Sequence, residues 1–179
     1  MSTETLTTTK WGIDPMHSEV TFKVKHLVIS TVTGRFEKFE GTMESEEENF
    51  NGAQVSFSLK TDSINTNVAD RDAHLKSDDF FNAEQYPEIK FNGTLAAKGD
   101  DYVLSGPLTI RDITKEVELN VEHGGIMTDP YGNVKAGFEV TGTVNRKEFG
   151  LKWSAVTEAG GVVVGDEVKL QINVQLAKQ

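Results

Sequence analysis

The sequence contains no cysteine, only 4 proline residues and no long apolar run. Without cysteine there is no disulfide framework, no thiolate nucleophile and no cysteine-ligated zinc. Uninterrupted apolar segments are short, as in Val162–Val164, whereas a membrane-spanning helix needs about 18 such residues or more. The segment Met1–Thr9 has neither a positive side chain nor an apolar stretch, so it lacks the features of a secretion signal. These absences exclude a transmembrane helix and predict a cytoplasmic protein.

Positive charge is also scarce, because 18 Lys and Arg residues face 28 Asp and Glu residues and leave a net charge of −10. An acidic chain repels a phosphate backbone, so nucleic acid is not an expected partner. The length of 179 residues suits one domain with its own core. We expect a disordered tail over residues 1–10 and a single domain over 11–179.

What the sequence does have is alternation of apolar and polar residues. The segment Glu116–Glu122 alternates without error, and Val168–Leu176 repeats the pattern. This period of two is typical of half-buried strands. Less regular alternation predicts six further strands, over residues 20–24, 39–43, 55–59, 89–95, 104–110 and 134–144.

Turn signals separate neighbouring strands and predict antiparallel pairing. They are Asn51–Gly52, Lys98–Asp101 and Asp129–Asn133. The eight strands would cover far more of the chain than is average, which indicates an all-β domain. Their apolar faces need cover, and closing the sheet into an eight-stranded antiparallel barrel provides it. A sandwich would also bury these faces, but the up-and-down order of the turns favours the barrel.

Two segments break the alternation. Residues 67–82 predict a short helical excursion, with Asn67 as a competent N-cap and a further turn at Asp78–Asn82. Asn145–Asp166 is the longest irregular segment, of a kind that is usually functional or disordered. The acidic run Glu44–Glu48 is typical of a solvated loop.

Motifs for catalysis or metal binding are not apparent. The histidines His17, His26, His74 and His123 lack the spacing that places two imidazoles on one metal, so we expect neither metal nor cofactor. No G-x-S-x-G elbow is present.

Two Asp and His pairs, Asp72 with His74 and Asp14 with His17, could each orient an imidazole. Capping and loop hydrogen bonds explain these pairs better than catalysis. The adjacent carboxylates of Asp78 and Asp79 suit a helix start rather than shared acid–base work. Gly124–Gly125 ends a predicted strand with no helix after it, so it forms no phosphate cradle.

Aromatic side chains follow the apolar faces of the predicted strands. Phe22, Phe57, Phe91 and Phe138 would point into a barrel, together with Phe36 or Phe39. An eight-stranded barrel is either just filled by its side chains or wide enough for one small ligand. Composition leaves both alternatives open.

A set of motifs spread along the chain resembles the YceI-like family. In order, the motifs are Trp11-x-Ile-Asp-Pro-x-His-Ser-x-Val-x-Phe22, Val24-Lys-His-Leu27, Arg71-Asp-x-His-Leu75, Asp79-Phe-Phe81, Tyr86-Pro87, Gly106-x-Leu-Thr-Ile110, Gly137-Phe138, Arg146, Phe149-Gly150, Trp153 and Gly165-Asp-x-Val168. The resemblance extends from Trp11 to Leu176. It implies an eight-stranded antiparallel, lipocalin-like barrel whose apolar interior holds a polyisoprenoid or a similar long-chain lipid.

The resemblance also implies the site. The expected pocket wall consists of Val20, Phe22, Val24, Phe36, Phe57, Phe80, Phe91, Leu104, Leu108, Phe138, Phe149 and Trp153. Arg71, His74 and Arg146 are expected at the pocket mouth or against a polar head group, with Asp72 beside them. An ion pair between Arg71 and Asp72 would serve equally as a clamp that holds the helical excursion on the barrel end.

The sequence departs from the family in two respects. Asp112 follows Arg111 where the family usually has glycine, which would alter the turn into the next strand. Many members carry a secretion signal and act in the periplasm, whereas this sequence shows none.

Three functions remain open at this stage. The first is a non-enzymatic carrier of a long-chain lipid. The second is an acid–base enzyme that uses Asp72 and His74, or Asp14 and His17, on a lipid or a sugar. The third is a packed structural or stress-response domain with protein partners. A homodimer is compatible with the resemblance, although the outward strand positions carry mostly charged, amide or hydroxyl side chains.

Overall fold

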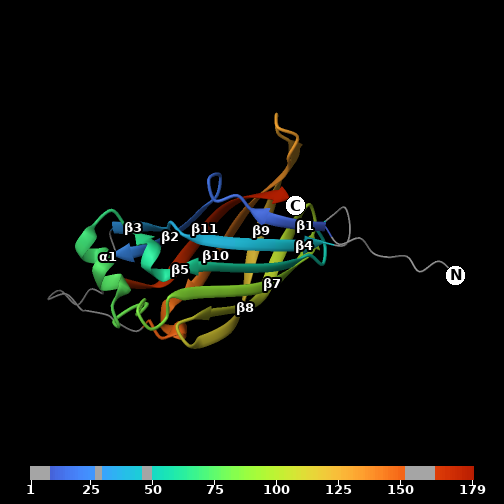
Figure 1. Cartoon of the computed structure of the whole chain (residues 1–179). Helices are drawn as coiled ribbons and strands as arrows, with labels where there is room; N and C mark the ends of the chain where they lie inside the picture. The colour runs from blue at the N-terminus through green and yellow to red at the C-terminus, as the bar shows by residue number, and fades with distance from the viewer. Residues whose placement is uncertain (1–8, 27–29, 46–49, 152–163) are drawn as a thin grey trace.

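The structure is a computed structural model that describes residues 9–26, 30–45, 50–151 and 164–179 (Figure 1). It consists almost entirely of strands, with one α-helix and two short 3-10 helices. In chain order the elements are β1 (Thr9–Ile13), β2 (Glu19–His26), β3 (Ser30–Phe36), β4 (Phe39–Ser45), β5 (Gln54–Lys60), η1 (Thr61–Ser63), β6 (Ile64–Asn65), α1 (Ala69–Lys76), β7 (Glu88–Lys98), β8 (Asp101–Ile110), β9 (Ile113–Thr128), β10 (Val134–Asn145), η2 (Arg146–Phe149) and β11 (Val164–Lys178).

The sheet closes on itself through the first strand. All strand pairs are antiparallel, and β1 pairs with β4 on one side and with β11 on the other. Trp11 lies opposite Met43 of β4 and opposite Lys178 of β11. The two ends of the described chain therefore meet in the ladder that completes the barrel.

Two of the eight strand positions around the barrel are each filled by two short strands. Strands β1 and β2 share one position, because both pair with β11 at successive places along it. Strands β4 and β3 share the next position, because β4 pairs with β1 and β3 pairs with β2. With β5, β7, β8, β9, β10 and β11 this makes the closed eight-stranded antiparallel barrel that the sequence predicts. Closure excludes the sandwich alternative.

All eight predicted strands are present, in β2, β4, β5 and β7 to β11. Sequence reasoning missed β1, β3 and β6. In β3 the inward positions are Val32, Gly34 and Phe36, so a glycine interrupts the apolar stripe that would have shown the strand. Strand β1 begins at Thr9, inside the segment expected to be a disordered tail.

Large side chains on the inner face lie over glycines of the neighbouring strand. Phe22 faces Gly34 across the pair of β2 and β3, and a Cβ atom at Gly34 would lie 2.3 Å from Cζ of Phe22. A Cβ atom at Gly142 would likewise lie 2.3 Å from a methyl carbon of Leu119. These glycines make room for rings and branched chains, so the inner surface packs without widening the barrel.

The predicted turns are present. Gly52 and Gly99 adopt φ angles of +84° and +63° in their turns, and the Oδ1 atom of Asp129 accepts hydrogen bonds from the backbone of Tyr131 and Asn133. Arg111 takes a left-handed φ of +56° in the tight turn between β8 and β9. The arginine of the Arg111–Asp112 pair itself therefore takes the left-handed conformation in this turn.

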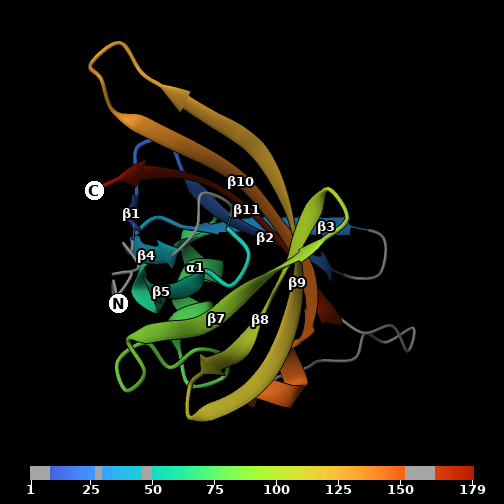
Figure 2. The same ribbon diagram turned by 90° about the vertical axis from the view of Figure 1, so that its right-hand side faces the viewer.

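Strand β9 is longer than predicted. It does not end at Gly124–Gly125 but continues to Thr128, and a register irregularity between Gly137 and Phe138 of β10 accommodates the glycine pair. Gly125 has a φ of +121°, which a non-glycine residue rarely adopts. Beyond this bulge the β9 and β10 hairpin projects past the rest of the barrel (Figure 2).

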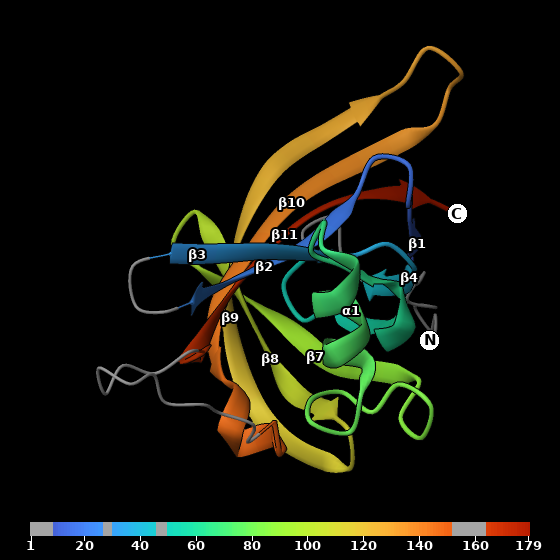
Figure 3. The ribbon, with the colours of Figure 1, turned by 90° about the vertical axis from the view of Figure 1, so that its left-hand side faces the viewer.

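Helix α1 lies across one end of the barrel (Figure 3), opposite the end that holds β1 and the C-terminus (Figure 1). The predicted helical excursion is confirmed, but Asn67 is not its N-cap. Asn67 has a left-handed φ of +68°, and Val68 occupies the cap position without a side-chain hydrogen bond. Asp78 and Asp79 lie in the turn after α1 and start no helix.

Several sequence predictions concern residues outside the described ranges. They include Trp153, the first eight residues, most of the acidic run and most of Asn145–Asp166. Within that last segment the structure describes η2 and the first residues of β11. Among the described residues, no helix is long and apolar enough to cross a membrane.

We predict that Gly106→Ala destabilises the protein by about 2–3 kcal/mol. The new Cβ atom would lie 2.1 Å from the backbone oxygen of Asn92 and 2.6 Å from Cα of Gly93, and backbone atoms yield less readily than side chains. Gly137→Ala is the matched control, since nothing lies within 4 Å of its Cβ position. Urea unfolding of both variants measures the difference, and equal stability would contradict the close approach of β7 and β8.

Candidate functional site

The barrel encloses an apolar space, which we call the barrel chamber, with a volume of about 170 Å³. Its wall is made chiefly of inward apolar side chains from the strands. The wall includes Val20, Phe57, Phe91, Leu104, Leu108, Val117, Leu119, Val121, Phe138, Val140, Ile172, Val174 and Leu176. The stripes of alternating residues in the sequence thus face one common cavity.

A second space of about 480 Å³, the helix-side chamber, lies between α1 and the barrel. Apolar residues from α1 and the following turn, Leu75, Phe80 and Phe81, form part of its wall. Charged side chains lie among them, namely Lys25, Asp70, Arg71 and Arg146, together with the imidazole of His74. Lys25 and Asp70 are exposed, and Val68 in the same wall is 45% exposed, so this chamber reaches the surface.

The two chambers share six wall residues, which we call the waist. The waist consists of Phe22, Phe36, Ile89, Ile110, Val144 and Leu170. Each residue comes from a different strand, from β2, β3, β7, β8, β10 and β11 in that order. The waist therefore marks the boundary at which the two chambers adjoin along the barrel.

The structure brings nearly all of the sequence-predicted site residues to these chambers. Val20, Phe57, Phe91, Leu104, Leu108 and Phe138 line the barrel chamber, Val24, Phe80, Arg71, His74 and Arg146 line the helix-side chamber, and Phe22 and Phe36 line both. Phe149 is 1% exposed but lines neither chamber, since it is packed as core in η2.

Sequence reasoning missed several wall residues. Three of them lie on the apolar face of the predicted strand Val168–Leu176, namely Ile172, Val174 and Leu176. The alternation in that strand was therefore enough to find them. Leu75 lies in α1 and Phe81 in the turn after it. The position of these two segments against the barrel brings both side chains to the wall of the helix-side chamber. Both residues belong to motifs that carry the family resemblance, which is the sequence signal that could have found them.

Arg71 and Asp72 hold the start of α1 through one shared partner, Thr66. Arg71 donates from Nε to the Thr66 hydroxyl (2.8 Å) and from a terminal nitrogen to the Thr66 backbone oxygen (2.7 Å). Asp72 accepts from the backbone nitrogen of Thr66 (2.8 Å) and from its hydroxyl (2.6 Å). The clamp expected for this pair is thus made by way of Thr66, which is 3% exposed.

His74 does not pair with Asp72, contrary to the orienting pair considered from the sequence. Its Nε2 atom lies 2.8 Å from Oδ2 of Asp79 in the turn after the helix, and its ring meets Phe80 edge to face at 5.1 Å. Asp72 is directed to Thr66 instead. Positions two apart on a helix face different directions, which is why these two side chains diverge.

Arg146 is a buried charge with structural partners. It is 3% exposed, and it donates from Nε to the backbone oxygen of Gly165 (2.8 Å) and from a terminal nitrogen to that of Leu151 (2.5 Å). Burial lowers the pKa of Arg146, and the carboxylate of Asp166 at 3.9 Å counteracts this. The guanidinium therefore ties the start of β11 to the segment after η2.

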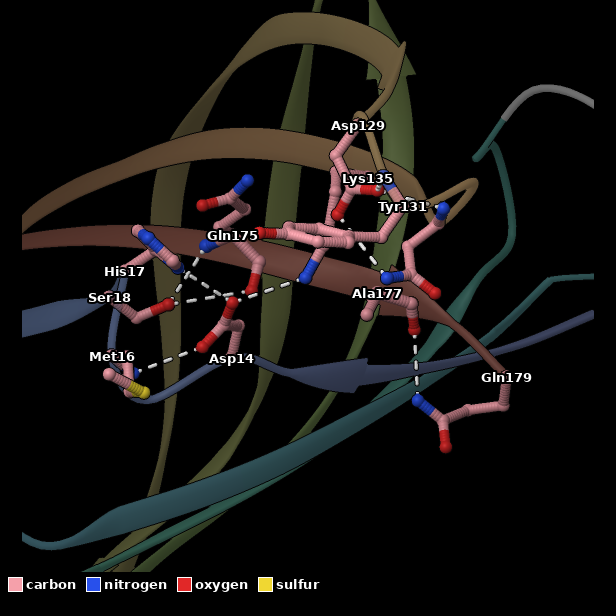
Figure 4. A network of polar contacts seen from close by, with 11 residues as sticks. Asp14, Met16, His17, Ser18, Asp129, Tyr131, Lys135, Gln175, Ala177 and Gln179 are labelled. Carbon is pink, nitrogen blue, oxygen red and sulfur yellow. Dashed lines mark hydrogen bonds and ion pairs between the residues drawn. The ribbon is translucent and has the colours of Figure 1, made fainter.

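Asp14 and His17 do pair, but away from both chambers. His17 Nδ1 lies 2.8 Å from Oδ2 of Asp14, and Lys135 of β10 donates to the same oxygen at 3.1 Å (Figure 4). The His17 hydrogen bond is the largest cause that lowers the pKa of Asp14 from 3.8 to about 2, with Lys135 and the backbone of Met16 assisting against burial. This network links the turn between β1 and β2 to β10.

An aromatic cluster fills the barrel end that lies beyond the barrel chamber. His123 stacks on Phe138 at 4.8 Å and meets Phe50 edge to face at 5.1 Å, and Trp11 meets Phe50 at 5.7 Å. Burial lowers the pKa of His123, so its imidazole is neutral at pH 7. This end therefore presents rings without charge to the chamber.

A closed antiparallel barrel with an apolar interior defines a lipocalin-like barrel protein. Within that class the chain belongs to the YceI-like family, whose domain model matches residues 11–176. A UPF0312 protein of Photorhabdus laumondii is 41% identical over 80% of this chain and 75% of its own length. A UPF0312 protein of Staphylococcus aureus is 34% identical over 94% of this chain and 98% of its own.

Solved structures share the fold. The Campylobacter jejuni YCEI protein superposes with a TM-score of 0.71 at 29% identity, covering 88% of this chain and 91% of its own. Burkholderia cenocepacia BcnA gives a TM-score of 0.79 at 19% identity, over 91% and 98% of the two chains. A polyisoprenoid binding domain from Saccharophagus degradans gives 0.69 at 15% identity, over 94% and 98%.

We predict that Arg146→Met lowers the free energy of unfolding by about 3 kcal/mol, because a buried carbonyl group of Leu151 and a half-buried one of Gly165 lose their donor. Lys147→Met is the control. Its side chain is 43% exposed and makes an ion pair of 3.2 Å with Asp166, so its loss costs about 0.5 kcal/mol or less. Thermal and urea unfolding distinguish the two, and similar losses would show that Arg146 is no anchor.

We predict that Asp14→Asn lowers stability by about 1 kcal/mol at pH 7, allowing for solvent screening. Because the folded pKa of Asp14 lies below its unfolded value of 3.8, its contribution is present above pH 3.8 and disappears as the pH falls through about 2. Urea unfolding of both proteins at pH 7 and below pH 3 checks this. A difference that stays constant across that range would contradict the prediction.

Proposed function

We propose that the protein binds a long-chain lipid, with a polyisoprenoid as the best-fitting class, and carries or sequesters it without chemical change. The observation that carries this proposal is the pair of apolar chambers that adjoin at the waist. Their shape along the barrel suits a long, narrow hydrocarbon. The open interior also favours binding over a packed structural domain.

Hydrocarbon burial supplies enough affinity for such a role. Burying ten carbons of a chain at about 0.8 kcal/mol each yields roughly 8 kcal/mol, which corresponds to about micromolar affinity before ordering costs are subtracted. No specific polar contact is required. The site therefore selects a class of chain by its shape.

The position of the charged side chains orients the ligand. They line the helix-side chamber, whereas the barrel chamber ends in uncharged rings. A polar head group would thus stay near Lys25 and Asp70 at the exposed rim, with its hydrocarbon directed toward the waist. A head group at the other end would lose its hydration among buried rings, where Trp11 Nε1 and His123 Nε2 are the buried side-chain atoms without a partner in the described part of the chain.

The arrangement of the candidate catalytic residues supports binding without chemistry. His74 contacts Asp79 and not Asp72, and Arg71 is bonded to Thr66. The pair of Asp14 and His17 lines neither of the two chambers. The family membership and the name of the Saccharophagus degradans domain agree with a lipid-binding role.

Native mass spectrometry of the purified protein tests the proposal directly. We expect a mass increment that solvent extraction identifies as a long-chain lipid, and we expect farnesol and geranylgeraniol to bind the extracted protein. A bare mass, together with no uptake of either alcohol, would refute it.

We predict that Val168→Trp reduces binding of geranylgeraniol by about tenfold or more, because an indole ring would occupy the helix-side chamber that Val168 lines. Lys169→Trp is the matched control, since this exposed neighbour points to the opposite face of β11. Competition binding measures both variants. If Lys169→Trp weakens binding as much, the chamber is not the site.

A further inference from the structure

The waist is a ring of apolar side chains between two spaces of unequal size. The helix-side chamber measures about 480 Å³ and the barrel chamber about 170 Å³. The rings of Phe22 and Phe36 lie 5.5 Å apart within the waist, and Phe36 meets Phe81 edge to face at 5.8 Å. A chain that enters beneath α1 must pass these rings to reach the interior of the barrel.

We propose that Phe22, at the waist, sets the length of hydrocarbon that the protein accepts. This inference rests on the proposed lipid-binding function and specifies its selectivity. Carbons up to the waist are buried in the helix-side chamber and strengthen binding. Carbons beyond the waist add little, because Phe22 restricts their entry into the barrel chamber.

The position of Phe22 is fixed from two sides. Its ring lies over Gly34 of β3, where a Cβ atom would approach Cζ to 2.3 Å, and the ring of Phe36 packs against it. Phe22 is 9% exposed, so it has little freedom to turn away. A side chain held in this way cannot move aside easily, so it sets a defined limit on the length of hydrocarbon that is bound.

The limit has a measurable form in a series of prenyl alcohols. Each methylene group that becomes buried improves affinity by about fourfold at most, so affinity must rise with chain length while new carbons are buried. It must level off at the chain length that reaches a closed waist. Removing the Phe22 ring shifts that plateau to longer chains.

The experiment measures dissociation constants for geraniol, farnesol, geranylgeraniol and solanesol, delivered from cyclodextrin, on the full chain. We expect wild-type affinity to level off within the series and to change by less than about threefold beyond that point. In Phe22→Ala the affinity for the longer alcohols continues to rise by about tenfold or more. If Phe22→Ala does not fold, Phe22→Leu replaces it, with a smaller shift in the same direction.

Two further variants separate the waist from a general loss of packing. Phe39→Ala removes an equal ring that lines neither chamber, and it should retain the wild-type length profile. Gly34→Ala acts in the opposite direction, because the new methyl group pushes the Phe22 ring toward the lumen and moves the plateau to shorter chains.

The outcomes are distinct. Parallel profiles for wild type and Phe22→Ala, or the same shift in Phe39→Ala, would overturn the role of Phe22 while leaving lipid binding intact. Binding of none of the alcohols by any variant would instead refute the proposed function itself.

Discussion

Closure of the sheet by β1 is the constraint on which the rest of the structure depends. Each of the eight strand positions of the barrel has one apolar face. These faces would be exposed to water if the first and last strands did not meet. Trp11 lies at this junction, opposite Met43 and Lys178, and it is 5% exposed. Because closure joins residues from the two ends of the chain, the interior exists only once the whole barrel has formed. The cavity is therefore a property of the complete fold and not of any hairpin.

The width of that interior depends on how the side chains share the available space. Phe22 over Gly34 and Leu119 over Gly142 let large groups lie flat against the barrel wall. With an alanine at either glycine, the ring or branched chain would be forced into the lumen. A small residue on one strand thus decides how far a large residue on the next strand narrows the cavity. Side chains alone could fill an eight-stranded barrel completely. Because the glycines let large side chains lie against the wall, this barrel retains two chambers.

The polar groups around the helix-side chamber are engaged in holding the barrel end together. Thr66 joins Arg71 and Asp72, and Arg146 joins Gly165 to Leu151. Satisfying these groups within the protein lets charged residues border an apolar space without a large desolvation cost. The same side chains that resemble a catalytic cluster in the sequence are anchors in the structure. What remains for a ligand is chiefly hydrophobic surface, with charge near the exposed rim.

The sequence alone determined the strands and their inward faces, because alternation with a period of two is local and is visible in segments such as Glu116–Glu122. It also placed the helical excursion, and its family motifs marked most of the wall residues. It did not reveal β1 or β3, whose stripes are short or broken by Gly34, nor the partners of His74 and Asp72. Only the tertiary structure decided the closure, the division into two chambers and the waist. These depend on contacts between residues far apart in the chain, such as Phe22, Ile110 and Leu170, and no local pattern encodes the distance between them.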